Sequence, residues 1–351
     1  MNPDLIRQAL RQVRYPGFSR DIVSFGLVKD VRIENGQVWI RMEIATRDAA
    51  VPEKIFKDAH AMLAEIPGIG TPKIEIEIKD APAQAGSSEA GSGKSSIPGI
   101  KHIIAVASGK GGVGKSTVSS NLALALAATG ARVGLCDCDL YGPSIAMMFG
   151  TQERPMANEQ EEIIPIEAHG IKLMSMGFLL EDRSPVIVRG PMATRYTQQF
   201  LRQVAWGELD YLVLDLPPGT GDIQLTIVQT VALDGAVIVT TPQEIALIDA
   251  RKAVSMFARV NVPILGLIEN MAWFECDHGV RYPLFGEGGG VREAEAMGVP
   301  VLAQIPIEPV VRSGGDSGKP VALMPPAESV ASAAFHQTAR TLASTLAAKT
   351  P

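Results

Sequence analysis

Residues 103–117 read IIAVASGKGGVGKST, and this stretch decides the fold. A run of apolar residues leads into a glycine-rich loop, and an Ala- and Leu-rich stretch at 121–128 follows it. The loop has the spacing G-x-x-x-x-G-K-[ST] in the strand–loop–helix context that this motif requires. Glycines let backbone N–H groups converge on phosphate oxygens, and the dipole of the following helix favours negative charge there. The stretch predicts a P-loop; the alternative is a structural turn that matches the pattern by chance.

Each residue type in this loop has an expected role. Lys115 is expected to reach the β- and γ-phosphates of ATP, and the Ser116 hydroxyl to bind Mg²⁺. Lys110 is a second lysine that the generic pattern does not require, and its alternative interpretation is a solvated loop residue. The predicted nucleotide-binding residues of the loop are Gly109, Lys110, Gly111, Gly112, Val113, Gly114, Lys115, Ser116 and Thr117.

Two further apolar runs end in acidic residues. Residues 132–138 lead to Asp137 and Asp139, and residues 211–217 contain Asp215, ahead of the sequence PPGTG. An aspartate that follows an apolar strand beside a P-loop can hold Mg²⁺ directly or through water. We therefore expect Asp215 to share the metal with Ser116. Either Asp139 or Asp215 could instead cap a helix N-terminus.

From Ile100 onward, short apolar runs alternate with longer helical stretches. Such apolar runs are typical of strands that are buried on both faces, and their alternation with helices predicts a doubly wound, mostly parallel sheet. Ligands bind at the carboxyl ends of the strands in such sheets. The expected strands lie at 102–108, 132–138, 211–217, 235–241 and 263–269, and the clearest helices at 115–129, 224–232 and 244–259.

The first 79 residues have a different pattern, which predicts a small α+β domain. Helical spacing covers 4–13 and 52–64, and strict alternation marks strands around 38–44 and at 73–79. Residues 80–99 are rich in Gly, Ser, Ala and Pro and have almost no large apolar side chains, which predicts a flexible linker. We expect domains at 1–79 and 100–351.

Composition excludes several classes of function. The net charge is 32 − 38 = −6, so no global basic field favours nucleic acid or anionic lipid. The sequence contains no run of about 20 apolar residues of the kind that spans a membrane. The N-terminus lacks the uninterrupted apolar core of a signal peptide. Three cysteines cannot form a disulfide framework. We expect a cytoplasmic protein with no nucleic-acid or membrane partner.

Several motifs, in order, carry a resemblance to a known family. The form GKGGVGKS resembles the deviant Walker A loop of the partition-ATPase and nitrogenase-iron-protein class. Residues 100–345 resemble the Mrp/ApbC family of iron–sulfur cluster carrier ATPases, and residues 3–79 resemble the MIP18-type module (domain of unknown function 59) that often precedes it. The motifs are DLYGPS at 139–144, DLPPGTGD at 215–222, TTPQEIALIDARKA at 240–253, ENMAWFEC at 269–276, LFGEGGG at 284–290 and GGDSGKPV at 314–321, with IVSFGLV at 22–28 and LAEIPGI at 63–69 in the module.

The resemblance implies a slow ATPase that carries iron–sulfur clusters to apo-proteins, working with the cluster assembly machinery. It implies a nucleotide-sandwich homodimer in which Lys110 reaches the partner's phosphates, much as an arginine finger does. It further implies that Asp139 orients the attacking water and that Asn270 contacts the adenine. Lys110, Lys115, Asp139 and Asp215 are then the expected catalytic residues.

The sequence departs from this family at its cluster motif. The family has a C-x-x-C pair after the Asn-Met motif, whereas this chain reads FECDHG at 274–279 and has Cys276 alone. Two Cys276 thiolates from a dimer supply half of what a [4Fe–4S] cluster normally needs. His278 could add two ligands or could be unligated. We expect Cys276 to hold a labile cluster, and Cys136 and Cys138 to be buried core residues.

Three alternatives stay open. One is a member of this family that has lost its own cluster. Another is a positioning ATPase of the ParA/MinD type, which needs a basic surface or a basic amphipathic tail, whereas residues 329–351 contain only Arg340 and Lys349 as lysine or arginine. The third is a small-molecule kinase or ligase. The N-terminal module has no cysteine, which favours a docking or structural role for it.

Overall fold

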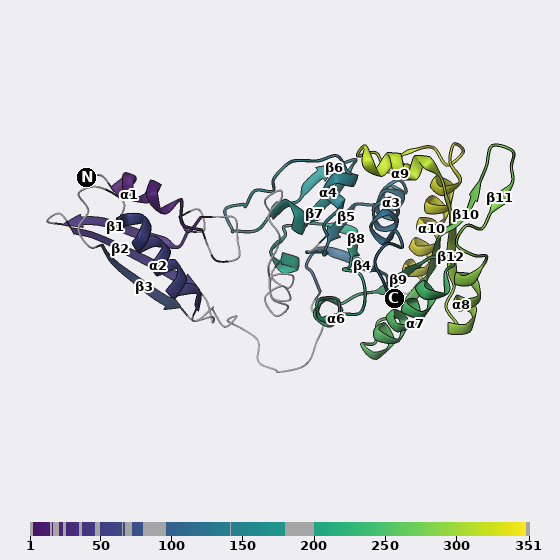
Figure 1. Ribbon diagram of the computed structural model, residues 1–351, viewed down its shortest axis with the longest axis horizontal. Coiled ribbons are helices and arrows are strands. Elements are labelled where there is room, and N and C mark those ends of the chain that lie inside the picture. Colours follow the sequence, from purple (N-terminus) through teal and green to yellow (C-terminus); the bar gives the residue numbers. More distant parts are fainter. Residues whose placement is uncertain are drawn as a thin grey trace. The chain divides into compact units, whose positions relative to one another are not determined.

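The computed structural model describes residues 3–14, 16, 21–23, 26–34, 37–45, 50–64, 66, 72–79, 96–140, 142–179 and 200–348. These residues form two compact units, one up to residue 79 and one from residue 96 (Figure 1). Residues 80–95 of the predicted linker lie outside the described residues, so the predicted domain boundaries stay predictions.

The N-terminal unit packs two helices against a three-stranded sheet. Its elements are α1 (Pro3–Leu10), β1 (Val28–Glu34), β2 (Gln37–Ala45), α2 (Ala50–Ala64) and β3 (Lys73–Lys79). Strand β2 lies in the middle, antiparallel to β1 and parallel to β3. The alternating side chains of β2 that face the core are almost completely buried, as the alternation predicted: they are Val38, Ile40, Met42 and Ile44.

Helix α1 ends at Leu10, three residues before the predicted end. Residues 12 and 13 continue in tighter turns, because their N–H groups donate to the carbonyls three residues back, at Ala9 and Leu10. Val13 is buried all the same. Its apolar spacing therefore reported burial correctly but overstated the length of the helix.

The second unit contains a nine-stranded sheet in the order β11-β10-β9-β4-β8-β5-β7-β6, with β12 paired to β10. Only the β6–β7 and β10–β11 pairs are antiparallel. The strands are β4 (Ile100–Ala107), β5 (Val133–Asp137), β6 (Ile166–Ala168), β7 (Ile171–Ser175), β8 (Leu209–Asp215), β9 (Gly235–Thr240), β10 (Ile264–Glu275), β11 (Arg281–Tyr282) and β12 (Val301–Ile307).

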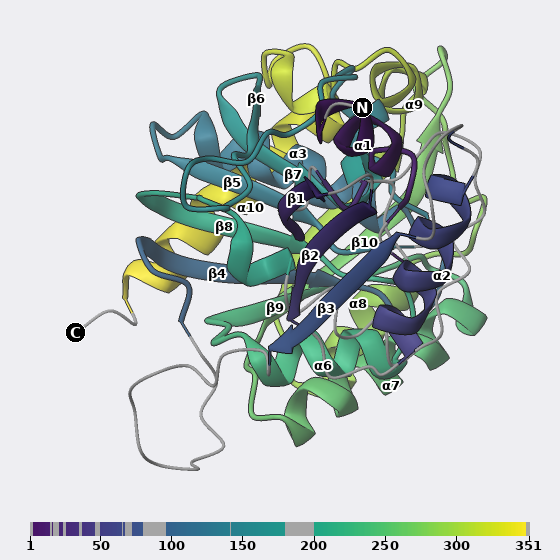
Figure 2. The same cartoon turned by 90° about the vertical axis from the view of Figure 1, so that its left-hand side faces the viewer.

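Helices cover both faces of this sheet. The chain passes from β4 toward β5 in one direction and from β8 toward β10 in the other, so right-handed crossovers place the connecting helices on opposite faces. Figures 1 and 2 show α3 and α10 on one face and α6, α7 and α8 on the other. The helices are α3 (Lys115–Ala127), α4 (Ile145–Met148), α6 (Asp222–Thr230), α7 (Glu244–Arg259), α8 (Gly289–Met297), α9 (Pro309–Asp316) and α10 (Val330–Ala347), with 3-10 turns η1 (Met176–Leu179) and η2 (Val321–Leu323).

The predicted doubly wound, mostly parallel sheet is confirmed, and all five expected strands are present. The carboxyl end of β4 lies near the centre of the sheet, where the winding direction reverses, so the glycine-rich loop follows the strand at the expected ligand edge. Among the described residues, no helix combines the length and apolar character needed to cross a membrane.

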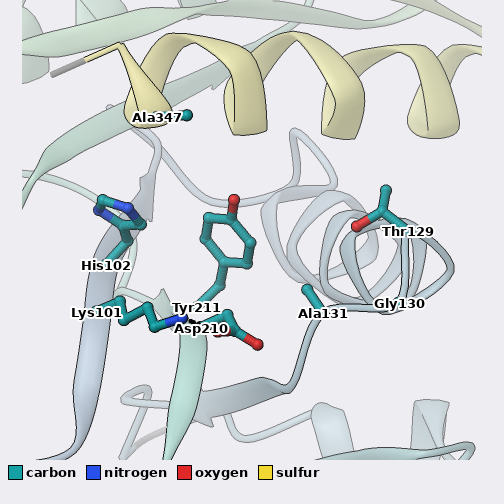
Figure 3. Close-up of a pocket in the computed structure, with 8 residues that line it drawn as sticks. All are labelled: Lys101, His102, Thr129, Gly130, Ala131, Asp210, Tyr211 and Ala347. Atoms are coloured by element: carbon teal, nitrogen blue, oxygen red, sulfur yellow. Dashed lines mark hydrogen bonds and ion pairs between the residues drawn. The ribbon is translucent and has the colours of Figure 1, made fainter. Parts of the chain in front are cut away.

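A shallow pocket of about 480 Å³ opens at the opposite edge, near the amino ends of β4 and β8 (Figure 3). The carboxylate of Asp210 accepts hydrogen bonds there from Lys101 Nζ at 2.7 Å and from the backbone N–H of Arg132 at 2.8 Å. These bonds hold the pKa of Asp210 well below its usual range. The lining residues are Lys101, His102, Thr129, Gly130, Ala131, Asp210, Tyr211 and Ala347.

We expect Asp210→Asn to lower the stability of this unit at pH 7, because the pKa of Asp210 is lower in the folded state. Such a carboxylate stabilises the fold above its unfolded pKa of about 3.9, and that contribution disappears as the pH falls further. The difference in urea midpoint between wild type and variant should be constant from pH 7 to 5 and should shrink below pH 4. A difference that does not change with pH would contradict this account.

Candidate functional site

The glycine-rich loop joins the end of β4 to the start of α3, and its backbone requires glycine at particular positions. Gly112 and Gly114 have φ values of 82° and 83°, in the left-handed region that L side chains rarely adopt. A Cβ atom on Gly114 would also collide with the side-chain amide of Asn270, and one on Gly109 with the carbonyl of Asp249 in α7. The loop is therefore pressed between α7 and β10.

Three donors converge on the Asp215 carboxylate at the end of β8. Lys115 Nζ lies 2.7 Å from Oδ1, Ser116 Oγ donates to Oδ2 at 2.6 Å, and Ser119 Oγ donates to Oδ1 at 2.5 Å. Asp215 is fully buried and Lys115 is 7% exposed. The structure thus brings together Lys115, Ser116 and Asp215, as predicted from the sequence. Sequence reasoning missed Ser119.

Asp137 lies beside Asp215, because the two residues are paired in register on neighbouring parallel strands. Its carboxylate accepts hydrogen bonds from the N–H groups of Asp139 and Ser144, both at 3.1 Å, and from the Ser175 hydroxyl. Burial and the nearby charge of Asp215 raise the pKa of Asp137 to about 7. Asp137 was expected at the strand end but without a role, although a charged residue after so apolar a run is a usable signal.

Asp139 lies just beyond the strand, in the loop that leads to α4. Its carboxylate accepts the N–H of Gly142 at 3.1 Å and so shapes its own loop. The alternative that Asp139 or Asp215 caps a helix is not what the structure shows, since α4 follows Ser144 and α6 follows Gly221. The part of Asp139 in orienting water stays a prediction.

The end of β10 contacts the loop from the other side. Asn270 is 7% exposed, and its Nδ2 donates to the carbonyl of Val113 at 2.9 Å. Its neighbour Glu269 is fully buried, with hydrogen bonds from Gln304 Nε2 at 2.7 Å and from the N–H of Gly290 at the start of α8. Glu269 fixes the strand that carries Asn270, and sequence reasoning gave it no role. The adenine contact of Asn270 stays a prediction.

The remaining predicted loop residues lie between β4 and the first turn of α3, and their part in nucleotide binding stays a prediction. Lys110 is partly exposed, and its ammonium forms no ion pair or hydrogen bond within the described residues. Gly111 lies between Lys110 and Gly112 in the same loop. Thr117 lies in the first turn of α3, where its carbonyl accepts Asn121 Nδ2 at 2.8 Å. The first turn of α3 is thus held by side chains as well as by the helix itself.

The donor set at the strand ends fits Mg²⁺. Ser116 supplies a hydroxyl oxygen, and Asp215 and Asp137 supply carboxylate oxygens. Hard oxygen ligands of this kind, completed by substrate phosphates and water, are those that Mg²⁺ prefers.

Cys276 begins the turn between β10 and β11. Its N–H donates to Val280 O at 3.0 Å, and its carbonyl accepts the N–H of Gly279 at 2.9 Å. The thiol is partly exposed, and His278 is exposed in the same turn. Among the residues that the structure describes, no three His, Cys, Asp or Glu side chains gather as a metal site. One chain therefore presents a single thiol here.

Cys136 and Cys138 are fully buried, with their sulfur atoms 3.9 Å apart, as expected for core residues on one face of a strand. The hydrogen bond to Cys136, together with burial, raises the pKa of the Cys138 thiol well above its usual range. The Cys138 thiol is therefore kept protonated, and both side chains lie away from solvent.

The loop is rich in glycine and lies between a buried strand and a helix. Its lysine and serine contact a buried aspartate at the end of a neighbouring strand. Together these features define a P-loop NTPase. Residues 99–343 match the family described as the NUBPL iron-transfer P-loop NTPase, and residues 3–76 match the iron–sulfur cluster assembly protein family. The chain belongs to the NUBPL iron-transfer P-loop NTPase family.

Individual relatives agree with this placement. An iron–sulfur cluster carrier protein of Deinococcus radiodurans is 44% identical, and the match covers 100% of this chain and 97% of that protein. Another, of Pseudomonas fragi, is 50% identical over 77% of this chain and 93% of its own. A solved structure of a nucleotide-binding protein from Archaeoglobus fulgidus in complex with ADP is 42% identical, with a TM-score of 0.56 over 63% of this chain and 87% of that one.

The loop geometry predicts unequal costs for alanine at two glycines. Gly112→Ala places a side chain at positive φ in open space and should cost about 1 kcal/mol of stability. Gly114→Ala has the same strain and also collides with Asn270, so it should cost more. Chemical denaturation measures both variants, and adding Asn270→Ala should recover part of the difference. Equal costs would show that the Asn270 contact does not constrain the loop.

Proposed function

We propose that this protein is an ATP-dependent iron–sulfur cluster carrier, which binds and slowly hydrolyses ATP at the P-loop and delivers clusters to apo-proteins. The observation that carries the proposal is the convergence of Lys115 and Ser116 on the buried Asp215 carboxylate. Membership of the iron-transfer P-loop family and the names of the relatives support the cargo.

In the proposed site, the loop amides and Lys115 bind the ATP phosphates. Ser116 and Asp215 hold Mg²⁺, which neutralises charge on the phosphates. Lys115 must then exchange its contact with Asp215 for a phosphate oxygen, so nucleotide binding separates an ion pair that is buried in the structure described here. Asp139 orients the attacking water, and Asn270 contacts the adenine.

We further propose that two copies close over the nucleotides. Lys110 supports this arrangement, because its ammonium lacks a partner within the described part of the chain and so is available to the phosphates of a second copy. Helix α7, which contacts the loop at Gly109, exposes Ile245 and Ile248 by 65% and 42%. A second chain that covers this helix would remove both apolar side chains from water.

Cys276 is the proposed cluster ligand, because it is the one partly exposed cysteine of the three. In a dimer, two Cys276 thiolates would hold a [4Fe–4S] cluster incompletely, with His278, a client protein or a small thiol completing the ligand shell. Incomplete ligation makes the cluster labile, which suits a carrier. The chain has no second cysteine beside Cys276 in residues 274–279, and this favours a second candidate, a family member that acts without a cluster of its own.

The two loop lysines provide a matched pair of variants. Lys115→Ala should weaken ATP binding by at least about tenfold, because a charged hydrogen bond to phosphate contributes about 1.5–3 kcal/mol. Lys110→Ala should bind ATP normally but hydrolyse it poorly, since its charge acts on the partner's phosphates. Calorimetry measures binding, and phosphate release measures turnover. If turnover per site depends neither on protein concentration nor on Lys110, the proposal that Lys110 acts on the partner's phosphates is wrong.

Anaerobic reconstitution with iron and sulfide tests the cargo. Wild type should develop the visible absorbance of a cluster and pass the cluster to an apo-ferredoxin-type acceptor, whereas Cys276→Ala should do neither and should still bind ATP. His278→Ala should retain the cluster less well, and Cys138→Ala, which removes a buried thiol, should match wild type. Uptake by wild type equal to that by Cys276→Ala would exclude Cys276, and no uptake at all would favour the cluster-free candidate.

A further inference from the structure

Ser119 is the one donor to Asp215 that neither nucleotide nor Mg²⁺ would recruit. It lies one turn into α3, after Lys115, and is fully buried. Its hydroxyl faces Asp215 Oδ1 at 2.5 Å and the carbonyl of Lys115 at 2.7 Å. A hydroxyl has a single proton, and the carboxylate is the stronger of the two acceptors.

In the proposed cycle, the other two donors leave Asp215 when nucleotide binds. Lys115 turns to the phosphates, and the Ser116 oxygen turns to Mg²⁺, so both release Asp215 as MgATP binds. Ser119 stays, because its position in the helix and its complete burial leave it no phosphate or solvent to reach. It would then be the donor that keeps the carboxylate from rotating after Lys115 leaves.

We propose that Ser119 is a positioning residue that holds Oδ1 of Asp215 so that Oδ2 stays directed toward Ser116 and the Mg²⁺ site. The inference rests on the proposed function, since it assumes that Ser116 and Asp215 hold the metal. Oδ2 already faces the Ser116 hydroxyl at 2.6 Å. Ser119 therefore acts on metal affinity through Asp215 and not on the nucleotide itself.

The same helix offers a matched control. Ser120 is the next residue and is 1% exposed, but its hydroxyl lies 3.5 Å from the sulfur of Met148 and makes no described contact with Asp215. Ser120→Ala and Ser119→Ala thus remove the same group from the same helix at nearly the same depth. Only Ser119→Ala removes a hydrogen bond to the carboxylate.

The test measures ADP affinity of the full chain by calorimetry, once in EDTA and once in excess Mg²⁺, and takes the ratio as the gain from the metal. Ser119→Ala should reduce this gain by about tenfold and leave the affinity in EDTA unchanged, because a hydrogen bond to a charged group is lost. Ser120→Ala should keep the wild-type gain. Ser119→Thr keeps the hydroxyl and should stay within about twofold of wild type.

Several results would overturn the inference. A gain in Ser119→Ala equal to that in Ser120→Ala would show that Asp215 needs no such support. A loss of the same factor in EDTA and in Mg²⁺ would indicate a structural role, as would Ser119→Thr behaving like Ser119→Ala. If wild type binds no ADP, or gains nothing from Mg²⁺, the nucleotide site itself is wrong and the proposed function fails with it.

Discussion

The buried carboxylate of Asp215 is the constraint on which the rest of the site depends. An ionised group away from water costs several kcal/mol unless it is paired and fully hydrogen-bonded. Asp215 meets that requirement through Lys115, Ser116 and Ser119, three residues within five positions at the start of α3. The first turn of α3 must therefore lie next to the carboxyl end of β8 in space. The loop that joins β4 to α3 must turn tightly enough to place it there.

The charge balance at the strand ends explains why a metal belongs with the nucleotide. Asp137 and Asp215 lie side by side, and Lys115 is the cation that faces them. Once Lys115 turns to a phosphate, two carboxylates and the phosphates would share one positive charge. A divalent cation between them restores the charge balance. Without that cation, a proton on Asp137 offsets part of the negative charge, in line with the raised pKa of Asp137.

Much of this could be predicted from the sequence, because the decisive signals are local. The P-loop spacing, the continuous apolar strands and the aspartate that ends β8 each occupy a short segment. What could not be predicted depends on pairing between distant segments. Strands β7 and β12 are short or partly exposed and take their identity from β5 and β10. Ser119 and Glu269 became visible only when the chain placed them against Asp215 and Gln304.

Strand β10 connects the two parts of the proposed cycle. It carries Asn270, which contacts the P-loop, and it ends one residue before Cys276. Between Asn270 and Phe274 its pairing with β12 slips, and Met271 there has a φ of 56°. Asn270 at the P-loop and the Cys276 turn therefore lie on either side of the stretch in which the regular pairing of β10 with β12 is interrupted.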